Sequence, residues 1–78
     1  MPEIKLRKMK SQWGNCKPAK NVITLNKRLI HYPVEFIEYV ILHEFVHFIH
    51  PDHSRAFYEV VERYMPDYKE RIALSERD

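Results

Sequence analysis

The clearest chemical pattern in this sequence is the run His43-Glu44-Phe45-Val46-His47. Residues four apart lie on the same face of a helix, so two imidazoles at this spacing can bind one metal ion. The H-E-x-x-H spacing is typical of a zinc site in which the glutamate between the ligands works as a general base. We therefore predict that His43 and His47 bind zinc and that Glu44 moves protons.

Zinc needs a third ligand, and several donors follow the pattern. His50 lies on nearly the same helical face, but its backbone is about 10.5 Å from that of His43 along the axis, a poor match to bonds of about 2.0–2.1 Å. His53 lies just beyond Pro51, which ends the helix and lets the chain double back. We predict His53 as the third ligand, with His50 and Glu62 as the alternatives.

Three protein ligands leave the fourth tetrahedral position of zinc to water, as in catalytic zinc sites. Zinc would lower the pKa of that water and polarise a scissile carbonyl. Glu44 would take the proton from the water and later donate it to the leaving amine. Without metal, these residues would form a buried polar cluster that is costly to desolvate, so we favour the zinc site.

A long apolar helix must position these residues. It is predicted to run over residues 33–50, because Pro33 suits a first turn and neither glycine nor proline follows before Pro51. Its apolar residues cover most of the circumference, which indicates packing on several sides. We expect this helix to be the central element of the fold.

Two strands are predicted ahead of the helix. Ile4, Leu6 and Met9 alternate with basic residues, which is typical of a strand with one solvated face. Residues 22–25 are β-branched and apolar and predict a second strand. Residues 10–21 are rich in turn formers and predict a long loop, so we expect the two strands to form an antiparallel hairpin.

Two shorter helices are predicted after the metal-binding helix. Asp52 or Ser54 can cap the first, which ends at Pro66, and residues 67–74 form the second. Apolar residues recur at helical spacing in the first, at Phe57, Val60, Val61, Tyr64 and Met65. In the second, the inward-facing residues would be Tyr68, Ile72 and Leu74. The expected fold class is α+β, with a small sheet packed on a central helix.

Composition limits the classes of protein. The 78 residues, with a formal net charge of +2, predict a single domain over residues 1–78, and this charge is too weak to indicate nucleic-acid binding. Cys16 is the only cysteine, so no internal disulfide can staple the small core, whereas a bound metal could. The lone thiol, the absence of a signal-like N-terminus and the lack of a membrane-spanning segment predict a cytoplasmic protein without membrane contact.

The run Trp13-Gly14-Asn15-Cys16 has two interpretations. In the structural one, Trp13 covers the core, Gly14 allows a turn with positive φ, and Cys16 is buried as a small hydrophobe. In the chemical one, Cys16 is a zinc ligand or a nucleophile, which a single cysteine without partner spacing does not by itself indicate. We expect the structural role.

Several blocks of the sequence together resemble the YgjP-like metallopeptidases, relatives of the SprT-like zinc proteases. These blocks are residues 9–16, 21–26, 28–30, 43–47 and 52–54, in the order of the family. The resemblance implies a zincin-like core, with a short sheet above the metal-binding helix. It also implies one Zn²⁺ held by His43, His47 and His53, Glu44 as the catalytic residue, and a peptide or protein substrate.

The chain departs from the family pattern at a few positions. The tryptophan block of the family commonly reads S-R-W-G-S-C, whereas Gln12 and Asn15 replace the arginine and the second serine here. Tyr58 stands where tryptophan is common. Family members also commonly carry an N-terminal portion ahead of this block. We therefore expect a second copy of the chain, a partner protein or the remainder of a split gene product to complete the cleft.

Two functions are compatible with these features. The first is a zinc metallopeptidase that hydrolyses peptide bonds through a zinc-bound water, with Glu44 as general base. The alternative is a catalytically inactive, zinc-stabilised module that contacts protein or nucleic acid, as the small size and the basic strand residues suggest. Both predict zinc-dependent folding, but only the first predicts turnover. A metal-free helical interaction domain would require the three-histidine pattern to be accidental.

Overall fold

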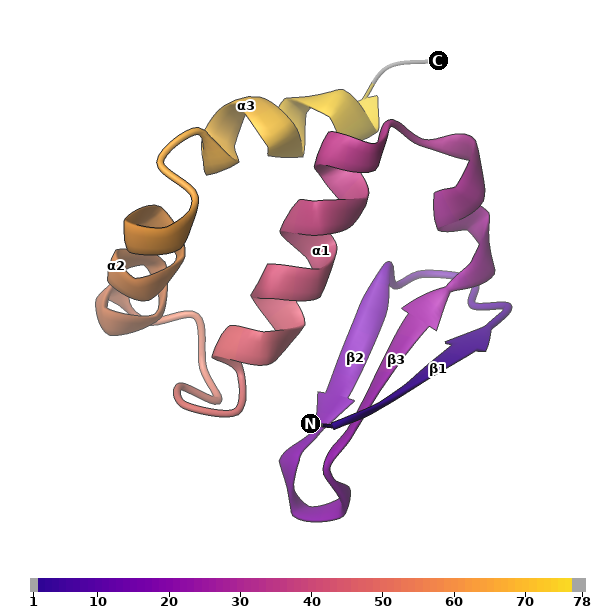
Figure 1. Cartoon of the computed structure of the whole chain (residues 1–78), viewed down its shortest axis with the longest axis horizontal. Helices are drawn as coiled ribbons and strands as arrows, with labels where there is room; N and C mark the ends of the chain where they lie inside the picture. Colours follow the sequence, from indigo (N-terminus) through magenta and orange to yellow (C-terminus); the bar gives the residue numbers. More distant parts are fainter. Residues whose placement is uncertain (1, 77–78) are drawn as a thin grey trace.

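A computed structural model describes residues 2–76 as a small sheet followed by helices (Figure 1). Within these residues the strands are β1 (Glu3–Arg7), β2 (Gly14–Lys17) and β3 (Val22–Asn26). The α-helices are α1 (Val34–Val46), α2 (Arg55–Tyr64) and α3 (Tyr68–Ala73), with short 3-10 turns at Pro18–Lys20, Lys27–His31 and Leu74–Glu76. The predicted α+β class, with two shorter helices after a central one, is confirmed.

The sheet topology differs from the predicted hairpin. Strand β3 is central, in the order β1-β3-β2, and β1 runs parallel to it, with Ile4 opposite Ile23 and Leu6 opposite Leu25. The expected antiparallel pairing of these two segments is therefore wrong. The reason is that Gly14–Lys17, which the turn formers around it assign to a loop, forms an additional strand antiparallel to β3. The chain thus reverses twice between β1 and β3.

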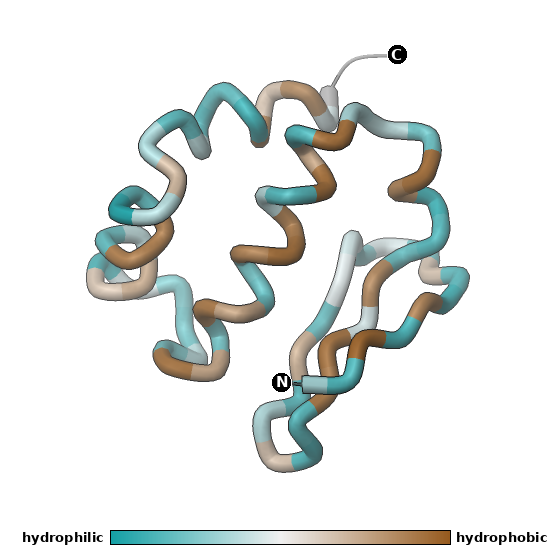
Figure 2. Tube along the Cα trace, in the orientation of Figure 1, coloured by the Kyte–Doolittle hydropathy of each residue, from teal (hydrophilic) through white to brown (hydrophobic). Residues whose placement is uncertain are grey.

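Helix α1 packs on β2 and β3 and contributes much of the core. Figure 2 shows apolar residues recurring along it and along the central strand. The helix ends at Val46, four residues earlier than the predicted end at His50. After Val46 the chain forms a tighter turn of the 3-10 type, in which the Ile49 N–H donates to the Val46 carbonyl at 2.9 Å. Pro51 disfavours helical geometry at His50, so the helix cannot continue to the predicted end.

Helices α2 and α3 form from the predicted signals. The Ser54 hydroxyl caps α2 by accepting from the Phe57 N–H at 3.3 Å, so Ser54 rather than Asp52 is the cap. Phe57 and Val61 are fully buried, whereas Tyr64, at the end of the same predicted stripe, is 71% exposed. In α3, Tyr68 is buried and Ile72 is partly buried, and Leu74, in the 3-10 turn after α3, is also partly buried, as predicted.

Strand β1 is exposed along its whole length. Ile4 is 45% exposed and Leu6 61% exposed, although their partners Ile23 and Leu25 on the same face of the sheet are buried. The alternating pattern therefore predicted the strand correctly. It also predicted that the apolar side chains would be buried, whereas Ile4 and Leu6 are exposed. In residues 2–76, no helix combines the length and the apolar character needed to cross a bilayer.

Candidate metal centre

The histidines predicted as ligands converge on one point. His43 comes from the last turn of α1, His47 directly follows that helix, and His53 lies in the loop before α2. Their Nε2 atoms are 3.2 Å apart between His43 and His47, and 3.1 Å apart in each of the other two pairs. Nitrogens bound tetrahedrally to one zinc ion at about 2.0–2.1 Å would be about 3.3–3.4 Å apart. The donor set therefore fits a single metal ion.

The mutual distances also argue against a purely hydrogen-bonded cluster. Each ring nitrogen either carries a proton or accepts one. Three nitrogens in mutual contact therefore cannot form three hydrogen bonds, because at least one pair consists of two donors or two acceptors. A cation shared by the three lone pairs removes this conflict.

Backbone geometry after α1 orients His47. Its Nε2 faces the other histidines, and its Nδ1 lies 3.2 Å from the carbonyl oxygen of His50. When Nε2 is a ligand, Nδ1–H donates to this carbonyl and fixes the ring, as is usual for ligating histidines. His50 contributes this backbone oxygen. Among the described residues, neither His50 nor Glu62 belongs to the group of side chains whose ligand atoms converge.

Tyr39 orients His43 from one helical turn earlier. Its hydroxyl lies 3.2 Å from His43 Nδ1, which can donate to it when Nε2 is a ligand. Burial, together with Tyr58, Tyr68 and Glu44, raises the pKa of Tyr39 to about 12, so the phenol stays neutral. Tyr39 was not predicted from the sequence, although it precedes His43 by four residues and therefore shares its helical face.

The protonation state of His43 suits metal binding. Burial, with His47 and His53 close by, lowers the pKa of His43 to about 4. Its imidazole is therefore neutral near pH 7, with the lone pair of Nε2 available.

Glu44 is buried beside strand β2. It is 6% exposed, and burial raises the pKa of its carboxyl group to about 7. A carboxyl group that titrates near neutral pH can both accept and donate a proton there, which is what a general base and acid must do.

Gly14 allows β2 to lie close to the Thr24 carbonyl oxygen of β3, next to the Glu44 carboxylate. A Cβ atom at Gly14 would lie 2.9 Å from the Thr24 carbonyl oxygen and 3.4 Å from Glu44 Oε2. Gly14 does not have positive φ, so that prediction is wrong. The glycine is needed for close approach instead, which the turn-rich composition around it did not reveal.

Comparison with known proteins places the chain in a family. The YgjP-like metallopeptidase domain model matches residues 1–74. The chain belongs to the YgjP-like metallopeptidase family. The YgjP-like domain is also similar to a crystal structure described as the metallopeptidase zymogen of Pyrococcus abyssi abylysin, with a TM-score of 0.78 and 25% sequence identity. That match covers 88% of this chain and 70% of the other, and it supports the zincin-like fold. No curated protein sequence matches the chain.

Two cavities of the YgjP-like domain meet at Glu44. The first, of about 290 Å³, is lined by the histidine group and by Cys16. The second, of about 410 Å³, extends along the N-terminal half of α1. Gln12, Gly14, His43 and Glu44 line both. The site therefore lies between the two cavities, beside Gly14 of β2.

In the run Trp13–Cys16 of the YgjP-like domain, Trp13 packs on other aromatic residues, whereas Gly14 and Cys16 line the cavity of the histidine group. Trp13 packs edge-on against Tyr32 and Phe36, with ring centroids 4.6 and 5.4 Å away, which matches its predicted structural role. Cys16 packs partly buried against the core. Burial and the nearby Glu44 raise the pKa of the Cys16 thiol, and among the described residues it does not join the converging ligand atoms.

Proposed function

We propose that this domain is a zinc-dependent peptidase that hydrolyses peptide bonds, with His43, His47 and His53 as zinc ligands and Glu44 as general base. The observation that carries the proposal is the set of Nε2 atoms 3.1–3.2 Å apart, next to a buried carboxyl group that lines the same cavity. When bound, zinc supplies a Lewis acid that acidifies water and polarises a carbonyl.

Other groups of the chain transfer protons and orient the metal ligands. Glu44 removes the proton from the attacking water and delivers it to the leaving amine, because its pKa near 7 allows both transfers. Tyr39 and the His50 carbonyl hold His43 and His47 through their Nδ1 atoms, so that both Nε2 atoms point at one position.

The free edge of β2 can align the substrate. The Asn26 N–H donates to the Trp13 carbonyl at 2.9 Å, so this pair is one of the hydrogen-bonded pairs of the antiparallel ladder. Hydrogen-bonded pairs alternate with non-hydrogen-bonded pairs along an antiparallel ladder. Gly14 and Cys16 belong to the non-hydrogen-bonded pairs, so their main-chain N–H and C=O groups point away from β3. An extended peptide can add to this edge as a further strand, directly beside Glu44.

Two substitutions test the proposal. Glu44→Gln should keep stoichiometric zinc and reduce hydrolysis of an unfolded protein substrate by about 10²–10⁴-fold. His53→Ala should lose zinc, whereas His50→Ala should keep it, because the His50 contribution is a backbone carbonyl. Elemental analysis and an anomalous-scattering map at the zinc edge measure the metal. Retained activity in Glu44→Gln, or retained zinc in His53→Ala, would refute the assignment.

The inactive zinc-stabilised module makes a different prediction. It requires stoichiometric zinc but no cleavage of any substrate by the unaltered protein. Structural zinc sites commonly have four protein ligands, whereas the converging group among the described residues has three. This favours the peptidase.

The proposal has three further parts. A second copy of the chain or a partner protein completes the cleft, residues 1–78 form a single domain, and the protein is cytoplasmic.

A further inference from the structure

The larger of the two cavities is apolar in character. Its volume of about 410 Å³ is within the range of small-molecule binding pockets, roughly 300–1,000 Å³. The apolar part of its lining consists of Trp13, Phe36, Tyr39, Val40 and Ile72. Among the described residues that line it, the titratable groups besides the Tyr39 phenol are His43 and Glu44, which belong to the proposed active site.

The polar residues at the wall do not change this character. The Ser75 hydroxyl donates to the carbonyl oxygen of Ile72 at 2.8 Å, so its hydrogen is used within its own turn. Gln12 is exposed and uncharged. A charged side chain entering the cavity would lose its water without gaining a partner other than Glu44.

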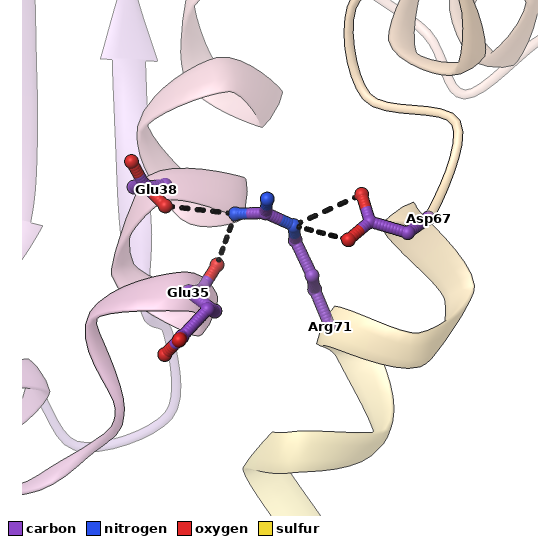
Figure 3. Close-up of polar contacts among 4 residues, drawn as sticks. All are labelled: Glu35, Glu38, Asp67 and Arg71. Carbon is purple, nitrogen blue, oxygen red and sulfur yellow. Dashed lines mark hydrogen bonds and ion pairs between the residues drawn. The ribbon is translucent and has the colours of Figure 1, made fainter.

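The wall opposite α1 is held in place by Arg71 (Figure 3). Its guanidinium donates to Glu38 Oε1 at 2.9 Å and to the Glu35 carbonyl at 3.1 Å, both on α1. It also donates to both carboxylate oxygens of Asp67 at 3.1 Å. These bonds fix α3 and the turn after it, which carry Ile72 and Ser75, so the cavity is formed before a ligand arrives.

We infer that this cavity is a specificity pocket for a large apolar side chain, such as leucine, methionine or phenylalanine, of a residue flanking the cleaved bond. The inference rests on the proposed function, because the pocket is useful for specificity only if a peptide is cleaved at Glu44. His43 and Glu44 line both cavities. A peptide with its carbonyl at the histidine group therefore places a neighbouring side chain in the apolar cavity.

Binding can be measured without turnover, because Trp13 is the only tryptophan and lines the pocket. Zinc-loaded Glu44→Gln protein is titrated with the acetyl amides of leucine, phenylalanine, alanine and lysine while Trp13 fluorescence is followed. The leucine and phenylalanine compounds should bind at least 10-fold more tightly than the alanine and lysine compounds. Equal binding of all four, or preference for lysine through the Glu44 carboxylate, would overturn the inference.

Filling the pocket provides a matched pair of variants. Ser75→Phe should weaken binding of the leucine compound at least 10-fold, and Ser75→Val should give an intermediate loss. Ala73→Leu adds bulk to the same segment at an exposed position outside the pocket and should leave binding unchanged. Thermal unfolding checks that all three variants are folded. Binding by folded Ser75→Phe equal to that of Ala73→Leu would contradict the inference.

A peptide library separates this inference from the proposed function. Mass spectrometry of products formed by the unaltered protein should show leucine, methionine and phenylalanine enriched at one position beside the cleaved bond, with this enrichment lost in Ser75→Phe. Cleavage without enrichment would refute the pocket and leave the peptidase intact. Selective binding of the leucine compound with no cleavage would refute the peptidase and show that the cavity selects apolar groups.

Discussion

The proposed chemistry depends at the residue scale on how closely side chains approach Glu44. His43 and His47 are brought together by helical spacing, and His53 by the turn at Pro51. Glu44 is buried because β2 lies against it at a residue without a side chain. The convergence of the three histidines therefore depends on local geometry, whereas the environment of Glu44 depends on a neighbouring strand.

Gly14→Ala should separate these two features. The new methyl group would be 2.9 Å from the Thr24 carbonyl oxygen, so β2 must shift relative to β3 and therefore relative to the Glu44 carboxylate, which the methyl group would meet at 3.4 Å. We expect a loss of stability of about 1–3 kcal/mol and a reduction of at least 10-fold in hydrolysis, with zinc retained. Denaturation curves, initial rates and zinc content measure these effects. Lys17→Ala, at the exposed end of β2, is the control, and full activity in Gly14→Ala would contradict the expectation.

At the scale of elements, Arg71 links helix α3 to α1, in addition to the packing of Tyr68 and Ile72 on the core. The Arg71 side chain is 20% exposed, whereas its partners Glu38 and Asp67 are 56% and 48% exposed. The bonds to Glu38 and Asp67 raise the pKa of Arg71, which therefore stays charged. Because most of the arginine side chain is also removed from solvent, its removal affects buried area as well as charge.

Arg71→Ala should destabilise the domain by about 1 kcal/mol, the upper range for a partly exposed ion pair. The expected reason is that α3 loses its bonds to α1. Urea denaturation measures the change. Arg55→Ala removes the exposed pair with Glu59, in which the side chains are 95% and 67% exposed, and should change stability by less than about 0.5 kcal/mol. Equal effects of the two substitutions would show that the Arg71 bonds do not hold α3.

At the scale of the whole molecule, the metal is expected to replace the disulfides that a small chain with one cysteine cannot form. The ligands connect α1 with the loop that leads to α2. A metal bound to them therefore joins the central helix to the C-terminal helices, and its binding energy becomes part of the folding energy.

Removing the metal should lower the melting temperature sharply. A ligand present at a thousand times its dissociation constant stabilises the folded state by about 4 kcal/mol. Each kcal/mol corresponds to about 4–8 °C in a domain of this size, so a chelator should lower the midpoint by at least about 15 °C. Circular dichroism melts with and without chelator measure this, and excess zinc should reverse it. An unchanged midpoint would argue against zinc as a structural staple.

Local patterns in the sequence were sufficient to predict the helices and the three histidines that converge. The spacing of His43 and His47, the Ser54 cap and the break at Pro51 involve residues within a few positions of one another, and helical geometry acts over that range. The sequence therefore determined which histidines could meet.

Only the tertiary structure decided the surroundings of those histidines. The parallel pairing of β1 with β3, the contact of Gly14 with Glu44 and the apolar cavity between Trp13 and Ile72 join segments far apart in the chain. Such contacts depend on how the whole chain closes around its core, so no local periodicity encodes them. For this reason the convergence of the three histidines could be predicted from the sequence, but the strand that neighbours Glu44 and the apolar pocket beside it could not.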